Sequence, residues 1–465
     1  MGMNNRFKDF GDDVRELVLS FEEMMLQGES HYFDVDQMEI IIDFYLETVD
    51  VDHLEQAVVF AEHLFPSSNS IRLRRSHLLC SKERYDEAFA ILQDLEQQEP
   101  TNTDVMYALG AIHSIRNNPK RSIEYYLKAS KDGYELGMVY GNIGDEYMRL
   151  SMGQEAMEYY QKSLKANPEE VRSIHNLFDC YEWLQKEDEG MDFFKAFIEE
   201  HPYSDEAWFS LGLCCRNLAL WEKAIEAFEF VSTINEKRYD GYSYRADCYC
   251  MMGDKQKAIA VLHECIPHVE DKYSVYGLIG SYYMDMENYA TAIIYFKKAV
   301  DEYAEEANVW MALAICYAYQ NDPYAAKDYL HHAFEVDPNA TFLYSDAARI
   351  CAMLGDQEEA VEFFEKGLDA GYDDRRWTDY ADCLIDWGRF DEAIDVLQRG
   401  VVECDYSFIF NERLAVCYFL TNRRNFLFNA LQACVQEDRT QAQELLRLCP
   451  AMSNDLEVMN ILQSN

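Results

Sequence analysis

The sequence predicts an all-α fold built from stacked helical hairpins. From Asp205 to Ala340 the chain can be laid over itself at a shift of 34 residues. Aromatic residues recur at this spacing at Trp208, Tyr242, Tyr276 and Trp310. Small residues recur at two further positions, first at Gly212, Ala246, Gly280 and Ala314, and then at Ala224, Ala258, Ala292 and Ala326. A strict period with one aromatic and two small positions is typical of helical repeat arrays.

The period extends over most of the chain. Counted from Asp205, frames of 34 residues start near Val35, Asn69, Thr103, Gly137, Val171, Asp205, Tyr239, Tyr273, Ala307 and Thr341, and after a one-residue deletion near Asp374 and Phe408. The residues of each frame are numbered below as repeat positions 1 to 34. The repeat array is therefore expected to cover residues 35–439, with residues 1–34 before it and residues 440–465 after it.

The prolines support the same phase. Seven of the nine fall at two positions of the period, with Pro66, Pro100, Pro168, Pro202 and Pro338 at one and Pro119 and Pro323 at the other. Proline is disfavoured inside helices and tolerated in turns and at first helical positions. The two positions are therefore expected to be the turn between hairpins and the turn within each hairpin. Four glycines near the second turn are expected to end first helices: Gly153, Gly253, Gly355 and Gly388.

One frame departs from the rule of small residues. Phe178 stands at repeat position 8, where most frames have Gly or Ala, and Gly190 stands at position 20, where most frames have Ala. We interpret this as an exchange of volume across one helix contact. Gly190→Ala is then expected to overpack that contact and to lower stability.

The segments at both ends are expected to cover the exposed faces of the terminal repeats. Residues 1–34 predict one helix with an apolar face formed by Val14, Leu17, Val18, Phe21 and Met25. In residues 440–465, Pro450 separates two short amphipathic pieces, one with Leu445, Leu446 and Leu448 and the other with Leu456, Met459 and Leu462. A partner-binding tail is the alternative role for this last segment.

From Val35 to Glu437 the repeats resemble the tetratricopeptide repeat family. The resemblance rests on the signature residues Trp208, Leu211, Gly212, Ala224 and Phe228, with Pro338 at the end of a later unit. It implies about 11–12 tandem repeats, in which antiparallel helix pairs stack into a right-handed α–α superhelix. It also implies a concave groove, lined by the first helix of each pair, that commonly binds peptide segments or partner helices.

The charge limits the classes of partner. The chain has 85 Asp and Glu residues against 41 Lys and Arg residues, a formal net charge of -44. Such a surface repels phosphate groups, so neither nucleic acid nor an anionic membrane is expected as a partner. No segment is apolar over the length of a signal peptide or a membrane span. Because 14 cysteines also suit a reducing compartment, a cytoplasmic protein is expected.

The cysteines and histidines predict neither a metal site nor a cofactor. Six cysteines share repeat position 10, which indicates buried packing residues: Cys180, Cys214, Cys248, Cys316, Cys383 and Cys417. His331 and His332 are adjacent, so on a helix they point about 100° apart and cannot hold one metal together. The motifs of nucleotide-binding proteins, serine hydrolases and zinc proteases are missing from the sequence. A protein without catalytic activity is therefore expected.

The expected groove has a polar and an apolar part. In the family geometry, repeat positions 2, 5, 6, 9, 12 and 13 face the groove. The candidate partner-binding residues at these positions are Asn142, Asp145, Arg172, His175, Asn176, Asp179, Glu182, Phe209, Asp247, Met311, Tyr319 and Asp382. Other residues at these positions include Leu213, Met284, Ile315, Asp346, Arg349 and Asp379. Asparagine can bond an extended peptide backbone in both directions, and aligned carboxylates favour a cationic segment.

Two further observations concern what the groove binds. In so acidic a chain, the same carboxylates also fit a face that is only solvated. The carboxylate clamp of chaperone-binding family members has Lys and Arg at repeat positions 2, 5 and 6 and Asn at positions 6 and 9. The frames from Asn69 to Thr341 have no Lys or Arg at position 5, and Asn142, Asn176 and Arg172 match only singly. A chaperone C-terminus is therefore not the expected ligand.

The sequence favours a non-catalytic scaffold that binds a protein or peptide, with a preference for a basic or amphipathic segment. A second hypothesis is a structural module that assembles with itself, and a remote third is an unrecognised enzyme. The sequence leaves the oligomeric state and the identity of the partner open.

Overall fold

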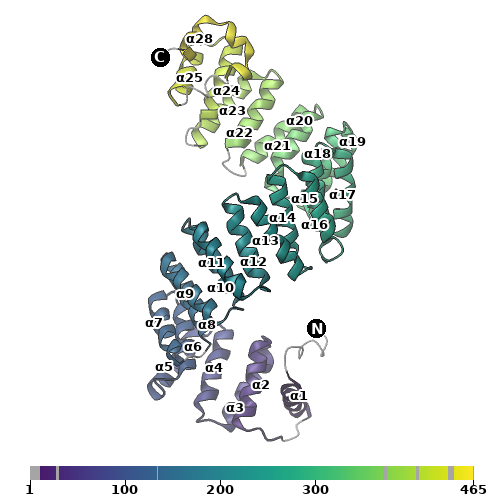
Figure 1. Ribbon diagram of the computed structural model, residues 1–465. Helices are drawn as coiled ribbons and strands as arrows, with labels where there is room; N and C mark the ends of the chain where they lie inside the picture. Colours follow the sequence, from purple (N-terminus) through teal and green to yellow (C-terminus); the bar gives the residue numbers. More distant parts are fainter. Residues whose placement is uncertain are drawn as a thin grey trace. The chain divides into compact units, whose positions relative to one another are not determined.

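The computed structural model describes residues 11–27, 31–132, 135–369, 374–404, 408–437 and 445–463 (Figure 1). These residues form α-helices joined by turns and three short 3₁₀ segments. The predicted all-α fold is confirmed.

The chain divides into two compact units, Met1–Met252 and Gly253–Asn465. Unit 1 contains α1 (Asp12–Gln27), α2 (Val35–Glu47), α3 (Val51–Leu64), α4 (Asn69–Ser81), α5 (Tyr85–Gln98), α6 (Thr103–Ile115), α7 (Pro119–Ala129), η1 (Ser130–Asp132), α8 (Leu136–Arg149), α9 (Gly153–Ala166), α10 (Val171–Trp183), α11 (Glu187–Glu200), α12 (Asp205–Asn217), α13 (Trp221–Ile234) and α14 (Tyr239–Met251). Unit 2 contains α15 (Lys255–Cys265), α16 (Lys272–Asp285), α17 (Tyr289–Glu302), α18 (Ala307–Tyr319), α19 (Pro323–Val336), η2 (Thr341–Leu343), α20 (Tyr344–Met353), α21 (Gln357–Asp369), α22 (Asp374–Asp386), α23 (Phe390–Glu403), α24 (Phe408–Leu420), α25 (Arg424–Glu437), α27 (Leu445–Leu448), η3 (Pro450–Asn454) and α28 (Leu456–Gln463).

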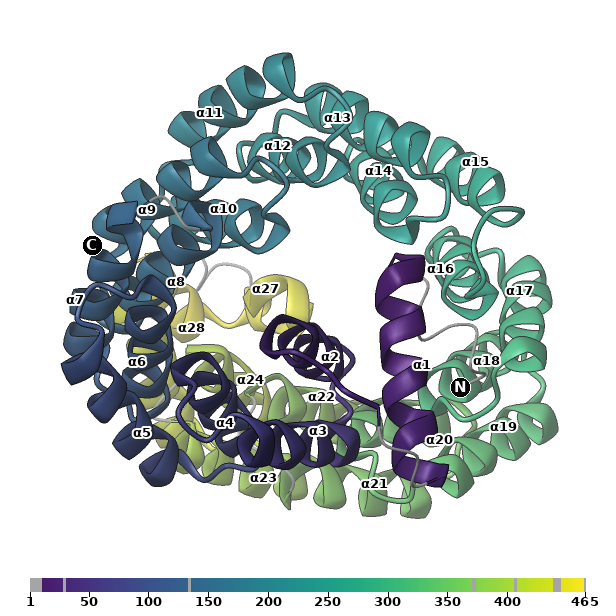
Figure 2. The same ribbon diagram turned by 90° about the horizontal axis from the view of Figure 1, so that it is seen from below.

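Within each unit, consecutive helices pack as antiparallel pairs, such as α8 with α9 and α16 with α17. From α2 to α25 the even-numbered helices are the first helices of the frames. Each begins at the frame start or one residue before it, except that η2 precedes α20 in the frame from Thr341. First and second helices form separate layers within a unit (Figure 2), with α10 and α12 opposite α11 and α13 in unit 1, and α16 and α18 opposite α17 and α19 in unit 2. The surface of the first helices that faces away from the second helices is called the first-helix face below.

Capping side chains set where first helices begin. The Asp34 carboxylate accepts a hydrogen bond from the Gln37 amide, and the Gln37 side chain accepts one from the Asp34 amide, which forms a capping box at α2. Ser204 caps α12 by accepting a hydrogen bond from the Ala207 amide. As expected, Pro119 and Pro323 are the first residues of α7 and α19, where a missing amide hydrogen costs nothing.

The turn within each hairpin contains one residue with left-handed backbone at repeat position 15. Gly355 and Gly388 fill it with φ of +80° and +74°, as expected of helix-ending glycines. In other repeats the same position is a non-glycine residue, such as Val49 with φ of 55°. The prediction for Gly153 is wrong, since Gly153 is the first residue of α9. A Cβ there would lie 2.3 Å from the Trp183 ring, so close packing is what requires glycine.

The prediction for the Phe178 frame is partly wrong. Residue 190 lies in a tight contact, but its nearest neighbours are Tyr181 and Cys214 and not Phe178. A Cβ at Gly190 would stand 2.9 Å from the Tyr181 ring and 3.1 Å from the Cys214 sulfur. Gly190→Ala is still expected to overpack this contact, because neither neighbour lies at the end of a flexible side chain.

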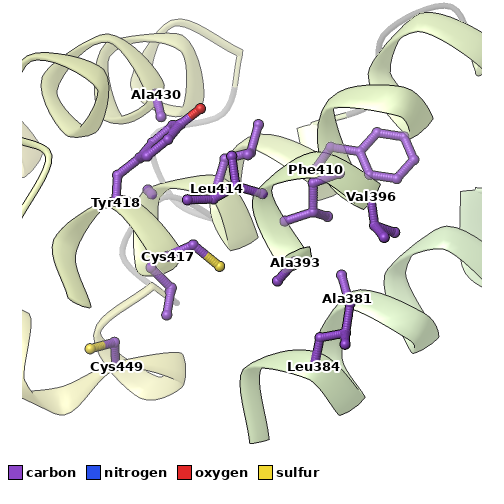
Figure 3. Close-up of a cluster of buried hydrophobic side chains, with 14 of the residues drawn as sticks. Ala381, Leu384, Ala393, Val396, Phe410, Leu414, Cys417, Tyr418, Ala430 and Cys449 are labelled. Carbon is purple, nitrogen blue, oxygen red and sulfur yellow. The ribbon is translucent and has the colours of Figure 1, made fainter. Parts of the chain in front are cut away.

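The end helices bury apolar residues against neighbouring repeats. In α1, Val18, Phe21 and Met24 are buried, whereas Met25, predicted on this face, is exposed. At the other end, Leu445 and Leu462 are buried in one core with residues of α22 to α25. Figure 3 shows part of this core, including Leu414, Cys417 and Cys449. The predicted start of this end segment at Thr440 lies outside the described residues.

Candidate partner-binding surface

The upstream polar candidates bond to one another. The Asp145 carboxylate on α8 accepts hydrogen bonds from the Asn176 amide on α10 at 2.8 Å and from the Tyr160 hydroxyl on α9 at 2.8 Å. The Arg172 guanidinium donates to Asp145 at 2.9 Å and to the Asn142 side chain at 2.7 Å. Four predicted groove residues therefore form one network, which joins two consecutive repeats.

Other predicted acids are also paired across repeats. Asp382 accepts two hydrogen bonds of 2.7 Å from Arg413, which lies 31 residues further along the chain. Asp247 accepts one of 3.0 Å from Arg216. The Asp382–Arg413 bond joins repeat position 9 of one frame to position 6 of the next, as does the bond from Asn176 to Asp145. Many of the carboxylates on the first-helix face thus already accept hydrogen bonds from side chains of the protein itself.

His175 and Phe209 belong to a neighbouring cluster. The His175 Nε2 atom lies 2.6 Å from the Glu206 carboxylate, and this hydrogen bond is the main cause that raises the pKa of His175. Burial acts to raise the pKa of Glu206, but bonds from His175 and Arg238 outweigh it, so this pKa is lowered. The Arg238 guanidinium also lies over the Phe209 ring, 4.6 Å from its centroid. This cluster fixes the position of α12 relative to α10 and α14.

Asp179 and Glu182 remain on the exposed surface of α10. Glu182 accepts a hydrogen bond of 2.8 Å from Asn217, whereas Asp179 has no hydrogen bond or ion pair within the described ranges. Partial burial raises the pKa of Asp179, and the charge of Glu182 raises it further. Asp179 is the carboxylate of the upstream candidates that stays open to a partner.

The two candidates in α18 have different environments. Met311 is 2% exposed and packs in a core with Leu330 and Ile350, so it presents no surface to a ligand. Tyr319 is 46% exposed and stacks on Tyr289, with ring centroids 4.7 Å apart.

Tyr319 also lines a pocket in unit 2 with a volume of about 340 Å³. Its walls come from α16, α17, α18 and α20. The lining residues are Met284, Tyr289, Ile315, Tyr319, Asp346, Arg349, Ile350 and Met353. This set, called the Tyr319 pocket below, brings together five residues that the sequence placed on the groove face: Met284, Ile315, Tyr319, Asp346 and Arg349.

The Tyr319 pocket is apolar with a charged edge. Met353 is 47% exposed, so apolar surface remains accessible beside Tyr319. At the edge, Arg349 lies 3.5 Å from the Asp346 carboxylate, and burial raises the pKa of Asp346. Asp379 on α22 is close enough that the charge of Arg349 lowers its pKa, although burial has the larger and opposite effect.

Three residues that line this pocket were not predicted to face the groove: Tyr289, Ile350 and Met353. Met353 occupies repeat position 13, as Tyr319 does, so the same rule could have found it. Tyr289 is the first residue of the second helix α17 and stacks on the tyrosine of the next repeat. No rule for first helices could have found that residue.

The cysteines at repeat position 10 lie where packing residues were expected. All of them are buried except Cys383, which is partly buried. Burial raises the pKa of Cys214 and of Cys316 to about 12, so both thiols are protonated at neutral pH. Among the described residues, no group of three or more His, Cys, Asp or Glu side chains is arranged to hold a metal ion. In the same part of the chain, every helix is too short or too polar to cross a membrane.

Comparison with known protein families decides the classification. Models of the tetratricopeptide repeat match residues 139–170, 240–266 and 273–305. The first segment spans α8 and α9, and the last spans α16 and α17, so the matches follow the helix pairs. The chain is a tetratricopeptide repeat protein. Tetratricopeptide repeat proteins generally mediate protein–protein interactions, and they are typically non-catalytic scaffolds.

Solved structures similar to this tetratricopeptide repeat protein have low sequence identity to it. The crystal structure of the APC/C hetero-tetramer Cut9–Hcn1 shares 13% identity at a TM-score of 0.39, over 86% of this chain and 92% of that chain. YrrB, a tetratricopeptide repeat protein with an unusual peptide-binding site, shares 19% at 0.30, over 38% and 91%. A thermophilic tetratricopeptide repeat protein of Thermus thermophilus shares 16% at 0.30, over 39% and 98%. No curated protein matches the chain.

Proposed function

We propose that this protein is a scaffold that holds a segment of another protein on its first-helix face, with one apolar side chain of that segment in the Tyr319 pocket. The observation that carries the proposal is the pocket itself. At about 340 Å³ it lies at the lower end of the ~300–1,000 Å³ range of ligand pockets, which suits a side chain better than a cofactor. Burial of one apolar side chain in such a pocket supplies roughly 1.5–3 kcal/mol.

The charge around the pocket favours a segment that also carries Lys or Arg. Asp379 has no hydrogen bond or ion pair within the described part of the chain. Its carboxylate is partly buried, and this burial outweighs the charges of Arg349, Arg375 and Arg413, so its pKa is raised. A cation on the partner would offset the cost of that burial. The net charge of -44 acts in the same direction over longer distances, because it attracts a basic segment and speeds its association. The expected partner is therefore an amphipathic segment in which a large apolar residue neighbours a basic one.

The upstream polar network has a supporting role in this proposal. Asn142, Asp145, Arg172 and Asn176 bond to one another and hold α8 and α10 together, so they are positioning residues. Asp179 and Glu182 are the exposed acids beside them and offer a second contact for a basic segment. Asp179→Lys in the full chain should slow the association of the partner and weaken its dependence on salt.

A photo-crosslinker at position 319 tests the proposal directly. A benzophenone amino acid replaces Tyr319 in the full chain, and crosslinking is carried out in an extract of the source cells. The matched control places the same group at Tyr324, which is 89% exposed in α19 of the same unit. Position 319 should capture a protein that position 324 does not, and the crosslinked segment should pair an apolar residue with Lys or Arg. Equal capture at both positions would contradict the proposal.

A peptide with the captured sequence then measures the contribution of each residue. Its affinity for the full chain should fall at least tenfold, about 1.4 kcal/mol, with Tyr319→Ala or Met353→Ala. Asp379→Lys should weaken it at low salt and less at high salt. Tyr324→Ala should leave it unchanged. A peptide that binds Tyr319→Ala as tightly as the native chain would show that the pocket is not its site.

A further inference from the structure

One second helix of unit 1 differs from all the others at repeat position 27. In every other frame the residue there is buried, and it is usually small: Ala61, Leu95, Ala129, Ser163, Val231, Cys265, Ala299, Ala333, Gly367, Gly400 and Cys434. In α11 the residue is Phe197, and its ring is only partly buried. A small residue at this position lets helices pack closely, so a phenyl ring here leaves apolar surface open between α11 and its neighbours.

Phe197 is the middle one of three neighbouring rings, two in α11 and the third at the residue that follows its last turn. It stacks on Phe193, with centroids 6.1 Å apart and planes at 23°, and lies 4.7 Å from the His201 ring. These rings form one wall of a pocket of about 410 Å³, opposite Gln161, Leu164 and Lys165 of α9. All of these residues come from second helices or the turn after them, so this pocket is not on the first-helix face.

A second pocket of about 420 Å³ adjoins the first. The two share Pro168, Glu200 and His201, and the second continues along the turn that contains Tyr203. Tyr203 is 85% exposed. Because they share these residues, the two pockets are treated as one depression, called the Phe197 groove below.

The Phe197 groove has unpaired carboxylates at its rim. Glu169 and Glu200 are exposed and have no side-chain hydrogen bond or ion pair among the described residues. Asp205 and Glu206 also line the groove, but Arg238 pairs with both. Lys165 is the one Lys or Arg among the residues that line the groove, which also include His201. The free carboxylates outnumber it, so the rim favours a cation.

We infer that the Phe197 groove is a second docking site, which takes a segment of a partner protein that presents an aromatic or long aliphatic side chain to Phe193 and Phe197 and a Lys or Arg to Glu169 and Glu200. Charge selects this occupant. A second copy of the chain would bring another 44 negative charges to an already acidic rim, so self-association here is opposed. Because this groove and the Tyr319 pocket lie on different helices, the scaffold can hold two segments independently.

A displayed library of random dodecamer peptides, selected on the full chain, tests this inference. Selected peptides are measured on Phe197→Ala, which installs the residue that repeat position 27 has in Ala61, Ala129, Ala299 and Ala333 and should therefore fold. The matched control is Val231→Ala, the same position in the next repeat, where the side chain is buried. Glu200→Lys tests the charged rim, and Tyr319→Ala separates this site from the Tyr319 pocket.

One class of peptides should pair an aromatic or long aliphatic residue with Lys or Arg. Its affinity should fall at least tenfold with Phe197→Ala and with Glu200→Lys, and should be unchanged with Val231→Ala and with Tyr319→Ala. The inference is overturned if no selected peptide depends on both Phe197 and Glu200. It is also overturned if every dependent peptide loses binding with Tyr319→Ala, since the first-helix face would then be the site. Failure of the Tyr319 pocket alone would leave this class of peptides intact.

Discussion

Gly280 lies directly against the ring of Phe296, where a Cβ on residue 280 would stand 2.7 Å from the ring atoms Cδ1 and Cε1. The two residues occupy repeat positions 8 and 24 of one helix pair. The same contact recurs between Gly110 and Tyr126, Gly144 and Tyr160, and Gly212 and Phe228. Where position 8 is alanine, position 24 is usually leucine, as in Ala314 with Leu330, Ala381 with Leu397 and Ala415 with Leu431, while Ala348 with Phe364 is an exception. The pair of positions thus keeps a similar total volume across the helix contact.

Gly280→Ala should therefore destabilise the protein by about 1–3 kcal/mol, because a ring held between two helices cannot move away. Adding Phe296→Leu should recover most of that loss, since it creates the pair used by other repeats. Gly277→Ala in the same helix is the control, because its Cβ would meet nothing within 4 Å, and it should be neutral or stabilising. Urea unfolding followed by circular dichroism measures all three variants. A double variant no more stable than Gly280→Ala would show that the two residues are not coupled.

Val49→Gly should stabilise the protein by about 1 kcal/mol. Val49 is β-branched and has a φ of 55°, a conformation that costs an L-residue roughly 1–2 kcal/mol and glycine little. The reciprocal variant is Gly355→Ala, with a φ of +80° and nothing within 4 Å of a Cβ, so its expected loss comes from the backbone alone. The midpoint temperature of thermal unfolding should rise for Val49→Gly and fall for Gly355→Ala. A decrease for Val49→Gly would mean that side-chain contacts outweigh the strain.

Glu146→Ile should raise stability by about 1–3 kcal/mol. Glu146 is 2% exposed. Its Oε1 atom lies 3.6 Å from the Arg149 guanidinium, but its Oε2 atom has no hydrogen-bond partner among the described residues, so the folded state carries an unsatisfied polar atom. The same repeat position holds Ile112 in the preceding repeat and Ile350 in unit 2. Glu158→Gln, on an exposed site of α9, controls for the loss of a negative charge. If Glu146→Ile lowered the urea midpoint instead, the carboxylate would have to be satisfied in solution.

His175 should make stability depend on pH. Its hydrogen bond to Glu206 raises its pKa above the unfolded value of about 6.5, so protonation favours the folded state. The resulting stabilisation should be fully present below about pH 6.5 and should be lost as the pH rises through the folded pKa. The difference in unfolding free energy between the native chain and His175→Gln should therefore shrink over this window. Glu206→Gln should remove the effect, and a difference that is independent of pH would contradict it.

The helix pattern could be predicted from the sequence because it depends on spacing within one repeat. Pro119, Pro323 and the frame starts locate helix ends through local backbone preferences, which a sequence shows directly. Pairing between repeats is different. Whether Asp145 or Asp382 is free depends on a donor about one period further along, and counting acids by position ignores that donor. The sequence therefore overstated how much negative charge the groove offers to a partner.

Burial of individual groove positions was also hard to predict. Met311 at repeat position 5 was expected to line the groove but is buried, as is Leu73 at the same position. A side chain at the edge of the first-helix face becomes buried when the space between its repeat and the next one is large enough to hold it. Position alone therefore cannot separate lining from core. The Tyr319 pocket depends in the same way on Tyr289, a residue of a second helix.

The spacing of the bonds between repeats has a consequence for how the chain folds. The bonds from Asn176 to Asp145, from Arg413 to Asp382 and from Arg216 to Asp247 each span 31 residues. A repeat can therefore complete its contacts as soon as the following repeat has been synthesised, with no need for a distant segment. Such a chain has a low contact order. Folding can therefore proceed one repeat at a time as the chain leaves the ribosome, and little apolar surface stays exposed during synthesis.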